Sequence, residues 1–139
     1  MSEKIIDLRV RYAETDQMGF AHHANYLIWC ELARTSLMRD QGVSYRELEE
    51  SGLFLPVVDA HITFRSPARF DDLVQVRCWV RELRSRRVDF GYQLKIDEEN
   101  RVLATATTRL IAMDKNNVVT TIPDTVRELL TPIDDPVRI

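Results

Sequence analysis

The sequence predicts a single α+β domain in which an antiparallel sheet wraps around one long central helix. Three observations support this fold class. The run from about Ala24 to Asp40 is apolar on nearly every side at its start, which is typical of a buried helix. Most of the chain after Leu53 alternates between apolar and polar residues, which is typical of strands. Short turns join these strand patterns, so neighbouring strands are expected to be antiparallel.

Length and composition limit the class of protein. The chain has 139 residues, 45% hydrophobic and 29% charged, so we expect one domain over residues 1–139 with 131–139 as a C-terminal tail. The net charge of −3 argues against a general nucleic-acid binder. No run approaches the ~18–20 apolar residues of a membrane span, and the first residues do not resemble a signal peptide. Cys30 and Cys78 lack metal-ligand spacing, which indicates a reduced, cytoplasmic protein.

The first half of the chain is expected to hold one strand and two helices. Residues 4–12 alternate in part, with Ile6, Leu8, Val10 and Tyr12 on one face. The long helix is expected to end near Gly42. Its core face is predicted to consist of Tyr26, Trp29, Cys30, Ala33 and Leu37. Ser44 and Glu47 have the spacing of a capping box, so a second, short helix is expected to run to about Glu50.

The second half is expected to form strands and one last helix. The predicted strands are 53–64 with an interruption near Pro56, 73–83, 88–96, 102–113 and 118–122. Pro123 suits the first turn of a short helix through Leu130. A sheet of this size has open edges, which two copies of the chain can cover by pairing edge to edge.

Polar and ionisable side chains are concentrated in the stretch 12–26, YAETDQMGFAHHANY. They are Glu14, Asp16, His22, His23, Asn25 and Tyr26. The stretch follows the first strand and precedes the apolar helix, where such side chains are costly unless they are paired or used. We therefore place the candidate functional site here.

Asp16 and the first turn of the helix have complementary chemistry. Unpaired N–H groups at a helix N-terminus polarise a carbonyl, and a nearby carboxylate activates water or attacks directly. Gly19 lies between them and permits a loop conformation that other residues disfavour. The alternative is that Asp16 is only a turn or capping residue.

A thioester is the substrate that best suits this small set of groups. Its thiolate leaving group has a conjugate acid with a pKa of about 8.5, so no strong general acid is needed. A G-x-S-x-G motif is absent, and Cys30 lies in an apolar helix face that disfavours a thiolate. Adjacent His22 and His23 are a weak signal for a metal site, and the reaction requires no metal or redox cofactor.

Two segments resemble the 4-hydroxybenzoyl-CoA thioesterase/YbgC-like family, which has the hotdog fold. One is Tyr12-x-Glu14-Thr15-Asp16-x-Met18-Gly19-x-x-x-His23-x-x-Tyr26. The other is Phe64-Arg65-Ser66-Pro67-Ala68-Arg69-Phe70-Asp71-Asp72, which is similar to an aromatic-x-x-Pro-Ala-x-x-Asp-Asp segment of that family. The order of elements from Ile5 to Leu130 also fits.

The resemblance implies roles for individual residues. Asp16 matches the catalytic aspartate, as nucleophile or general base, and His23 matches the histidine whose backbone amide polarises the thioester carbonyl. Tyr26 matches a tyrosine that supports the site or lines the acyl pocket, and Gly19 lets the loop approach the helix. His22 departs from the pattern, because related chains often carry tyrosine or another large residue there.

The resemblance also implies a substrate and an assembly. The expected partner is an acyl-CoA, with an acyl-carrier protein as a possible thiol carrier, and the chain is expected to form a homodimer or homotetramer. Clustered arginines bind phosphates, so Arg84, Arg86 and Arg87 at a predicted hairpin are candidates to hold the nucleotide end of CoA. The alternative is a solvated hairpin.

Several other interpretations stay open from the sequence. Glu14 is expected to be a solvated or salt-bridged acid, and His61 a structural residue in a strand. The acyl pocket is expected to draw its walls from Phe20, His22, Tyr26 and His61. The competing functions are a hotdog dehydratase, whose His-x-x-x-x-Gly-x-Pro motif is absent, and a non-catalytic acyl-CoA-binding module.

Overall fold

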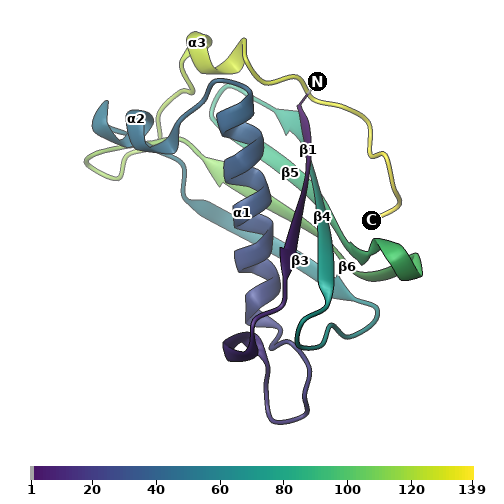
Figure 1. Ribbon diagram of the computed structural model, residues 1–139. Helices are drawn as coiled ribbons and strands as arrows, with labels where there is room; N and C mark the ends of the chain where they lie inside the picture. Colours follow the sequence, from purple (N-terminus) through teal and green to yellow (C-terminus); the bar gives the residue numbers. More distant parts are fainter. Residues whose placement is uncertain (1) are drawn as a thin grey trace.

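The fold is built on a five-stranded sheet in the order β1-β4-β5-β6-β3, with every neighbouring pair antiparallel (Figure 1). The structure is a computed structural model that describes residues 2–139. The strands are β1 Glu3–Arg9, β3 Val57–Phe64, β4 Leu73–Leu83, β5 Arg87–Ile96 and β6 Arg101–Ile111. A separate two-residue ladder joins β2 (Leu53–Phe54) to β7 (Met113–Asp114).

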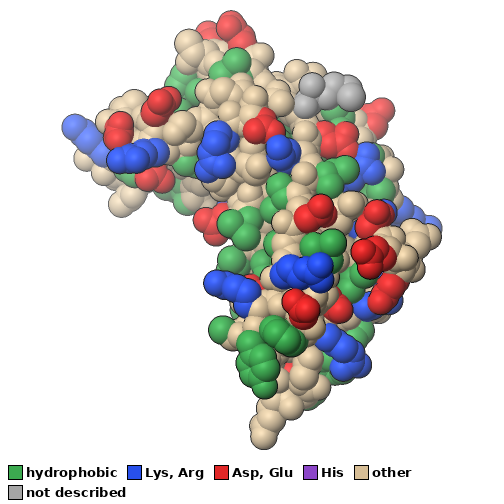
Figure 2. Space-filling view, in the orientation of Figure 1, with side chains coloured by type: hydrophobic (Ala, Val, Ile, Leu, Met, Phe, Trp, Pro, Cys, Tyr) green, Lys and Arg blue, Asp and Glu red, His purple; other side chains and the backbone are tan. Residues whose placement is uncertain are grey.

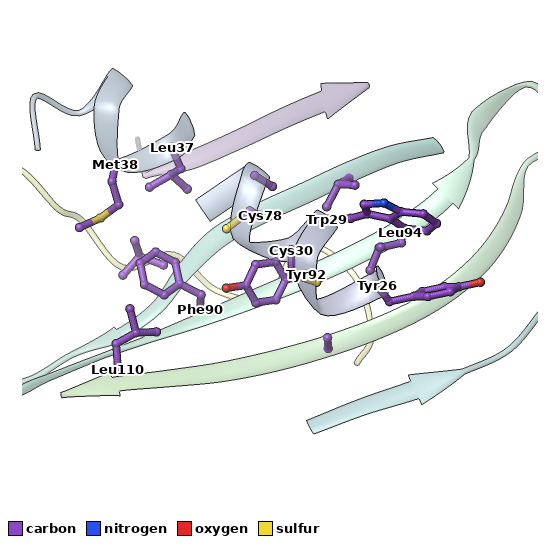
Figure 3. Packing of buried hydrophobic residues seen from close by; sticks show 14 of the residues in the cluster. Tyr26, Trp29, Cys30, Leu37, Met38, Cys78, Phe90, Tyr92, Leu94 and Leu110 are labelled. Atoms are coloured by element: carbon purple, nitrogen blue, oxygen red, sulfur yellow. The ribbon is translucent and has the colours of Figure 1, made fainter. Parts of the chain in front are cut away.

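Helix α1 (Ala24–Asp40) lies along one face of this sheet (Figure 1). Its predicted core face is buried and packs with Phe90, Tyr92 and Leu94 of β5 in one hydrophobic cluster (Figure 3). Burial of a large apolar side chain contributes roughly 1.5–3 kcal/mol, so this face anchors the helix on the sheet. The α+β fold with a sheet around one long helix is therefore confirmed, as are the bounds of the helix.

One flank of α1 is not covered by the sheet. Leu27, Ile28 and Leu32 are 39%, 48% and 52% exposed, and Figure 2 shows hydrophobic side chains at the surface over this helix. The prediction that the first half of the helix is buried all round is wrong for a single copy, because the sheet ends at β3 and no further element covers this flank.

The two short helices start where the sequence predicts. The hydroxyl of Ser44 accepts a hydrogen bond from the N–H of Glu47 (3.3 Å) at the start of α2 (Tyr45–Glu50), which is one of the two hydrogen bonds of the predicted capping box. α3 (Asp124–Arg127) starts after Pro123 but is shorter than expected. Within residues 2–139 no helix has the length and apolar character that crossing a bilayer requires.

One predicted strand end and one predicted strand are wrong. β1 stops at Arg9 because the chain turns there into the 3-10 helix η1 (Tyr12–Glu14), which leaves the Tyr12 side chain 77% exposed. Residues 118–122 form no strand in the described chain. Both sides of β6 are already paired, with β5 and β3, so this segment makes only an isolated bridge from Val119 to Met113.

The face of the sheet opposite α1 is covered in part by residues 131–139. The N–H of Ile133 donates to the carbonyl of Val80 (3.0 Å), and Asp135 accepts from the indole N–H of Trp79 (2.9 Å) and pairs with Arg81 (2.8 Å). Trp79 is fully buried between this segment and Gly91, where a Cβ would lie 2.5 Å from the indole. The C-terminal segment thus shields a large aromatic ring on the polar side of the sheet.

Candidate active site

The loop before α1 folds back on itself. Thr15 and Ala21 form an antiparallel bridge, and the N–H of Asp16 donates to the carbonyl of Phe20 (2.8 Å). Gly19 closes the turn with a φ of +82°, which residues with a Cβ adopt at a cost of about 1 kcal/mol. The expectation that Gly19 supplies an otherwise disfavoured loop conformation is confirmed.

The Asp16 carboxylate is fixed by its own loop. Its Oδ1 accepts hydrogen bonds from the N–H groups of Met18 (2.9 Å) and Phe20 (3.3 Å). Its Oδ2 has no hydrogen-bond partner within residues 2–139. One oxygen therefore orients the carboxylate while the other stays available to a reactant.

A cavity of about 350 Å³ opens beside this carboxylate. It is bounded by the loop before α1, the first turn of the helix and the end of β3. Its lining residues are Asp16, Met18, Phe20, Ala21, His23, Tyr26, Phe64, Arg65, Ser66 and Pro67. An apolar cavity with a few converging polar groups is the usual form of a small-molecule site.

Some N–H groups at the start of α1 have hydrogen-bond acceptors within the chain, and one has none. The N–H of Ala24 donates to Nδ1 of His22 (3.2 Å), and the N–H of Asn25 donates to the carbonyl of His22 (3.0 Å). The N–H of His23 has no acceptor among the described residues. Because His23 lines the cavity, its amide is a donor left free for a ligand.

The buried carboxylate of Glu14 links the loop before α1 to the helix. It is only 5% exposed, and its carboxylate accepts hydrogen bonds from the Arg11 N–H (2.7 Å) and the Trp29 indole (2.8 Å). Burial raises its pKa, but these hydrogen bonds outweigh burial and hold the pKa below its ordinary value. The expectation of a solvated acid is wrong, since the indole of Trp29 reaches back from the helix; the salt bridge, with Arg11 at 3.4 Å, is present.

The Glu14 carbonyl ties the loop to the helix. It accepts from the N–H of His22 (2.7 Å) and from the side-chain amide of Asn25 (2.9 Å). Asn25 also donates to the carbonyl of His22 (3.2 Å). These bonds fix the peptides on both sides of the free His23 amide, a role that the local sequence did not reveal.

Tyr26 both lines the cavity and supports its wall. Its hydroxyl accepts from the N–H of Ala68 (3.3 Å), and its ring packs edge-on against Phe64 with centroids 5.1 Å apart. Of the expected wall residues, Phe20 and Tyr26 line the cavity, whereas His22 and His61 do not. Sequence reasoning missed Arg65, which lines the cavity, is exposed and has no ion-pair partner within residues 2–139.

The two cysteines lie in the core and take no part in the cavity. Both are free and buried. Burial raises the pKa of the Cys30 thiol to about 12, and it raises that of Cys78 well above its ordinary value. Residues 2–139 contain no group of three or more His, Cys, Asp and Glu side chains arranged to hold a metal ion.

Comparison with known proteins identifies the family. The thioesterase-like superfamily matches residues 10–130. The chain belongs to this superfamily. It is 36% identical over 111 residues to a putative acyl-CoA thioesterase, YneP, of Bacillus subtilis, covering 80% of each chain. It is 27% identical over 107 residues to the acyl-CoA thioester hydrolase YbgC of Escherichia coli, covering 77% of this chain and 79% of the other.

Solved structures agree with this family. A hypothetical protein from Thermus thermophilus has a TM-score of 0.86 and 38% identity, over 91% of this chain and 96% of that one. The family, the hotdog fold and the thioesterase class that the motif implied are therefore confirmed.

In the structure of this thioesterase, the predicted site residues lie in two separate places. Asp16, His23 and Tyr26 line one cavity, and Gly19 turns the loop beside them. Arg84, Arg86 and Arg87 follow β4, whose eleven residues extend roughly 33–36 Å away from the end of the sheet near the cavity. In one copy the arginine hairpin is thus at the opposite end of the sheet (Figure 1).

Proposed function

We propose that this chain hydrolyses acyl-CoA thioesters to CoA and a carboxylic acid, with Asp16 as general base or nucleophile and the His23 N–H as oxyanion donor. The observation that carries the proposal is the pairing of two unsatisfied groups in one cavity. A carboxylate oxygen without an internal partner and a backbone N–H without an acceptor belong to two residues, Asp16 and His23, that line the same cavity of about 350 Å³.

The free amide is suited to polarising the thioester carbonyl. A carbonyl oxygen placed against the His23 N–H gains a hydrogen bond that strengthens as the oxygen becomes negative. Such a donor contributes on the order of 3–4 kcal/mol to the transition state. The bonds made by Glu14, His22 and Asn25 hold this peptide in place, so the donor needs no reorganisation when the substrate reacts.

Asp16 then supplies the nucleophile. As general base, its Oδ2 takes a proton from water while the hydroxide adds to the carbonyl carbon. The tetrahedral intermediate collapses with cleavage of the C–S bond, and the leaving thiolate takes the proton back from Asp16. As nucleophile, Asp16 attacks directly and forms a mixed anhydride that water hydrolyses. Both routes need only the groups that line the cavity.

Two copies complete the site through the outer edge of β3. This strand pairs only with β6, and its other edge is open within one copy. Antiparallel pairing of two β3 strands about a two-fold axis brings the arginine hairpin of one copy to the cavity end of the other. The lateral separation is then three to four strand spacings, roughly 15–20 Å, which CoA can span.

Basic side chains at the cavity mouth and at the hairpin bind the phosphates of CoA. Arg65 is exposed at the cavity and unpaired in the described chain. Arg84 and Arg87 both pair with Glu82, at 2.7 and 2.9 Å. A phosphate must displace or share that carboxylate, so Arg65 is the stronger candidate. An acyl-carrier protein remains the competing thiol carrier.

Thiol release with a panel of aliphatic and aromatic acyl-CoAs tests this function. Asp16→Asn is expected to lower kcat by about 10³-fold or more while the melting temperature stays near that of the wild type. Asp134→Asn is the matched control, because Asp134 is exposed and has no interaction with another described residue. Retention of most activity in Asp16→Asn contradicts the assignment.

The same panel separates an enzyme from a binding module. A binder releases no thiol from any acyl-CoA and retains its affinity for a non-hydrolysable thioether analogue in Asp16→Asn. A thioesterase releases thiol in the wild type. Both bind the analogue in Asp16→Asn, so thiol release separates them, and analogue binding shows that an inactive variant still has a formed site.

A further inference from the structure

The second motif segment, residues 64–72, forms one wall of the candidate active site. Its residues 64–67 line the cavity. None of them makes or breaks a bond in the steps assigned to Asp16 and the His23 amide. The segment therefore affects these steps through its position, and the contacts that hold it in place determine the shape of the cavity.

Arg101, the first residue of β6, holds this wall from outside the cavity. Its Nη1 donates to the carbonyl of Pro67 (2.6 Å) and to the hydroxyl of Ser66 (3.1 Å). Its Nε pairs with Glu99 of η2 (Asp97–Glu99) at 2.7 Å, and its Nη2 lies 3.9 Å from Asp72. The Pro67 carbonyl has no other hydrogen bond within residues 2–139. Hydrogen bonds from a charged donor are short and roughly twice as strong as neutral ones.

The peptide group whose carbonyl Arg101 binds is also held on its other side. Its N–H, which belongs to Ala68, donates to the hydroxyl of Tyr26 in the first turn of α1 (3.3 Å). Burial raises the pKa of Tyr26, so this hydroxyl is a neutral phenol, and the positive charge of Arg101 opposes that rise. A hydrogen bond to a peptide carbonyl strengthens the bond made by the N–H of the same peptide. Arg101 thus couples the start of β6 to the start of α1.

The next carbonyl along the wall holds the loop that carries Asp16. The carbonyl of Ala68 accepts from the N–H of Ala21 (2.8 Å). The neighbouring residue, Phe20, donates its N–H to Oδ1 of Asp16 (3.3 Å) and accepts from the Asp16 N–H (2.8 Å). A short chain of backbone hydrogen bonds therefore runs from the peptide bound by Arg101 to the carboxylate that the reaction uses.

Arg101 itself is not among the residues that line the cavity. Its side chain is 33% exposed, and its pair with Glu99 alone is a surface ion pair of the kind that contributes little to stability. What distinguishes Arg101 from such a pair is the carbonyl of Pro67, which no other described residue binds. A group that holds the reacting parts without touching the substrate affects the rate more than binding.

We propose that Arg101 is a positioning residue for thioester hydrolysis, which fixes the Asp16 carboxylate relative to the start of α1 by holding the Pro67–Ala68 peptide. The inference rests on the proposed function, because it concerns the same cavity. It adds a residue that lies 85 positions after Asp16 in the sequence and in neither motif segment.

Steady-state kinetics with an acyl-CoA test the role of Arg101. Arg101→Met retains an apolar stem but no donor, and it is expected to lower kcat about tenfold while KM stays within about twofold of the wild type. Arg101→Lys keeps a charged donor for the Pro67 carbonyl, so kcat is expected to recover to within about threefold of the wild type. The folded fraction of each variant, measured by circular dichroism at the assay temperature, corrects its kcat.

Arg109→Met is the matched control. Arg109 lies on the same strand, roughly 26 Å further along, and pairs with Asp89 (3.0 Å), so its replacement also removes an arginine and an ion pair. Its kcat is expected to equal that of the wild type. A raised KM with unchanged kcat in Arg101→Met assigns Arg101 to substrate binding and overturns the proposal. The proposal is also overturned by an unchanged kcat, by a loss that the folded fraction explains, or by an Arg101→Lys variant as slow as Arg101→Met.

Hydrogen exchange followed by mass spectrometry tests the coupling without turnover. Amides of residues 15–21 are expected to exchange faster in Arg101→Met than in the wild type and in Arg109→Met, because the wall that holds their loop is loosened. Unchanged exchange overturns the proposal. A wild type that releases no thiol contradicts the proposed function instead, because exchange still reports whether Arg101 holds the Asp16 loop.

Discussion

The two ends of the sheet differ in how many of their charged groups are paired. At the end near the start of α1, Asp16, the His23 amide and Arg65 each keep an unsatisfied atom or charge toward one cavity. At the other end, Arg84 and Arg87 form ion pairs with Glu82 and Asp89 (2.5 to 3.8 Å), although the Nε of Arg87 has no hydrogen bond and Arg86 forms no ion pair within residues 2–139. A local abundance of charge is thus common to both ends, whereas groups left unpaired around a cavity distinguish the candidate site.

The largest effect on stability is expected from removing the buried acid Glu14. Glu14→Ala leaves the Trp29 indole and the Arg11 N–H without their acceptor, which costs about 2–4 kcal/mol of folding free energy. Urea unfolding measures this loss, and kcat should fall with it because the loop that holds His23 loosens. Glu98→Ala at an exposed position is the control. Unchanged stability in Glu14→Ala means that Glu14 does not support the site.

Low pH should reduce the stability that Glu14 contributes. The pKa of Glu14 is below its ordinary value of 4.5 in the folded chain, so its contribution to stability is fully present above that value. The contribution is lost as the pH falls through the lower, folded pKa. Unfolding free energies measured from pH 7 to pH 3 should therefore fall more steeply for the wild type than for Glu14→Gln. Parallel curves contradict this role of the carboxylate.

Arginine substitutions compare the two ends directly. Arg65→Ala is expected to raise KM for acyl-CoA about tenfold, because it removes an unpaired cation from the cavity mouth. Replacing Arg84, Arg86 and Arg87 together should raise KM by less and reduce its dependence on salt. Steady-state kinetics with Arg138→Ala as control measure both effects. If the triple variant leaves KM unmoved, the hairpin is only solvated surface.

The smallest effect is expected at His22, which positions the neighbouring amide. His22→Ala removes the acceptor of the Ala24 N–H and should lower kcat about 3–10-fold with little change in KM. His22→Asn retains a side-chain oxygen that can cap the same N–H, so its kcat should stay within about twofold of the wild type. Equal losses in the two variants show that the cap has no part in the reaction.

The sequence predicted the elements whose pattern is local. The bounds of α1, the start and end of β4 and the cap of α2 follow from side-chain periodicity and from one capping hydroxyl. The predicted strand at 118–122 is wrong because a strand also needs a free neighbour: the adjacent β6 is already paired on both sides, which alternation cannot report. The salt bridge expected as one alternative for Glu14 is present, but its burial was not predicted, because its partner Trp29 lies fifteen residues away.

By itself, the sequence determined the family and the hotdog fold and predicted Asp16, His23, Gly19 and Tyr26 as site residues, because the motif and the hydrophobic pattern lie in consecutive residues. Only the tertiary structure decided which polar groups are satisfied. It paired Glu14 with Trp29, left the His23 amide free and separated the arginine hairpin from the cavity. Hydrogen bonds and burial depend on which segments meet in space, and that information is absent from any one segment.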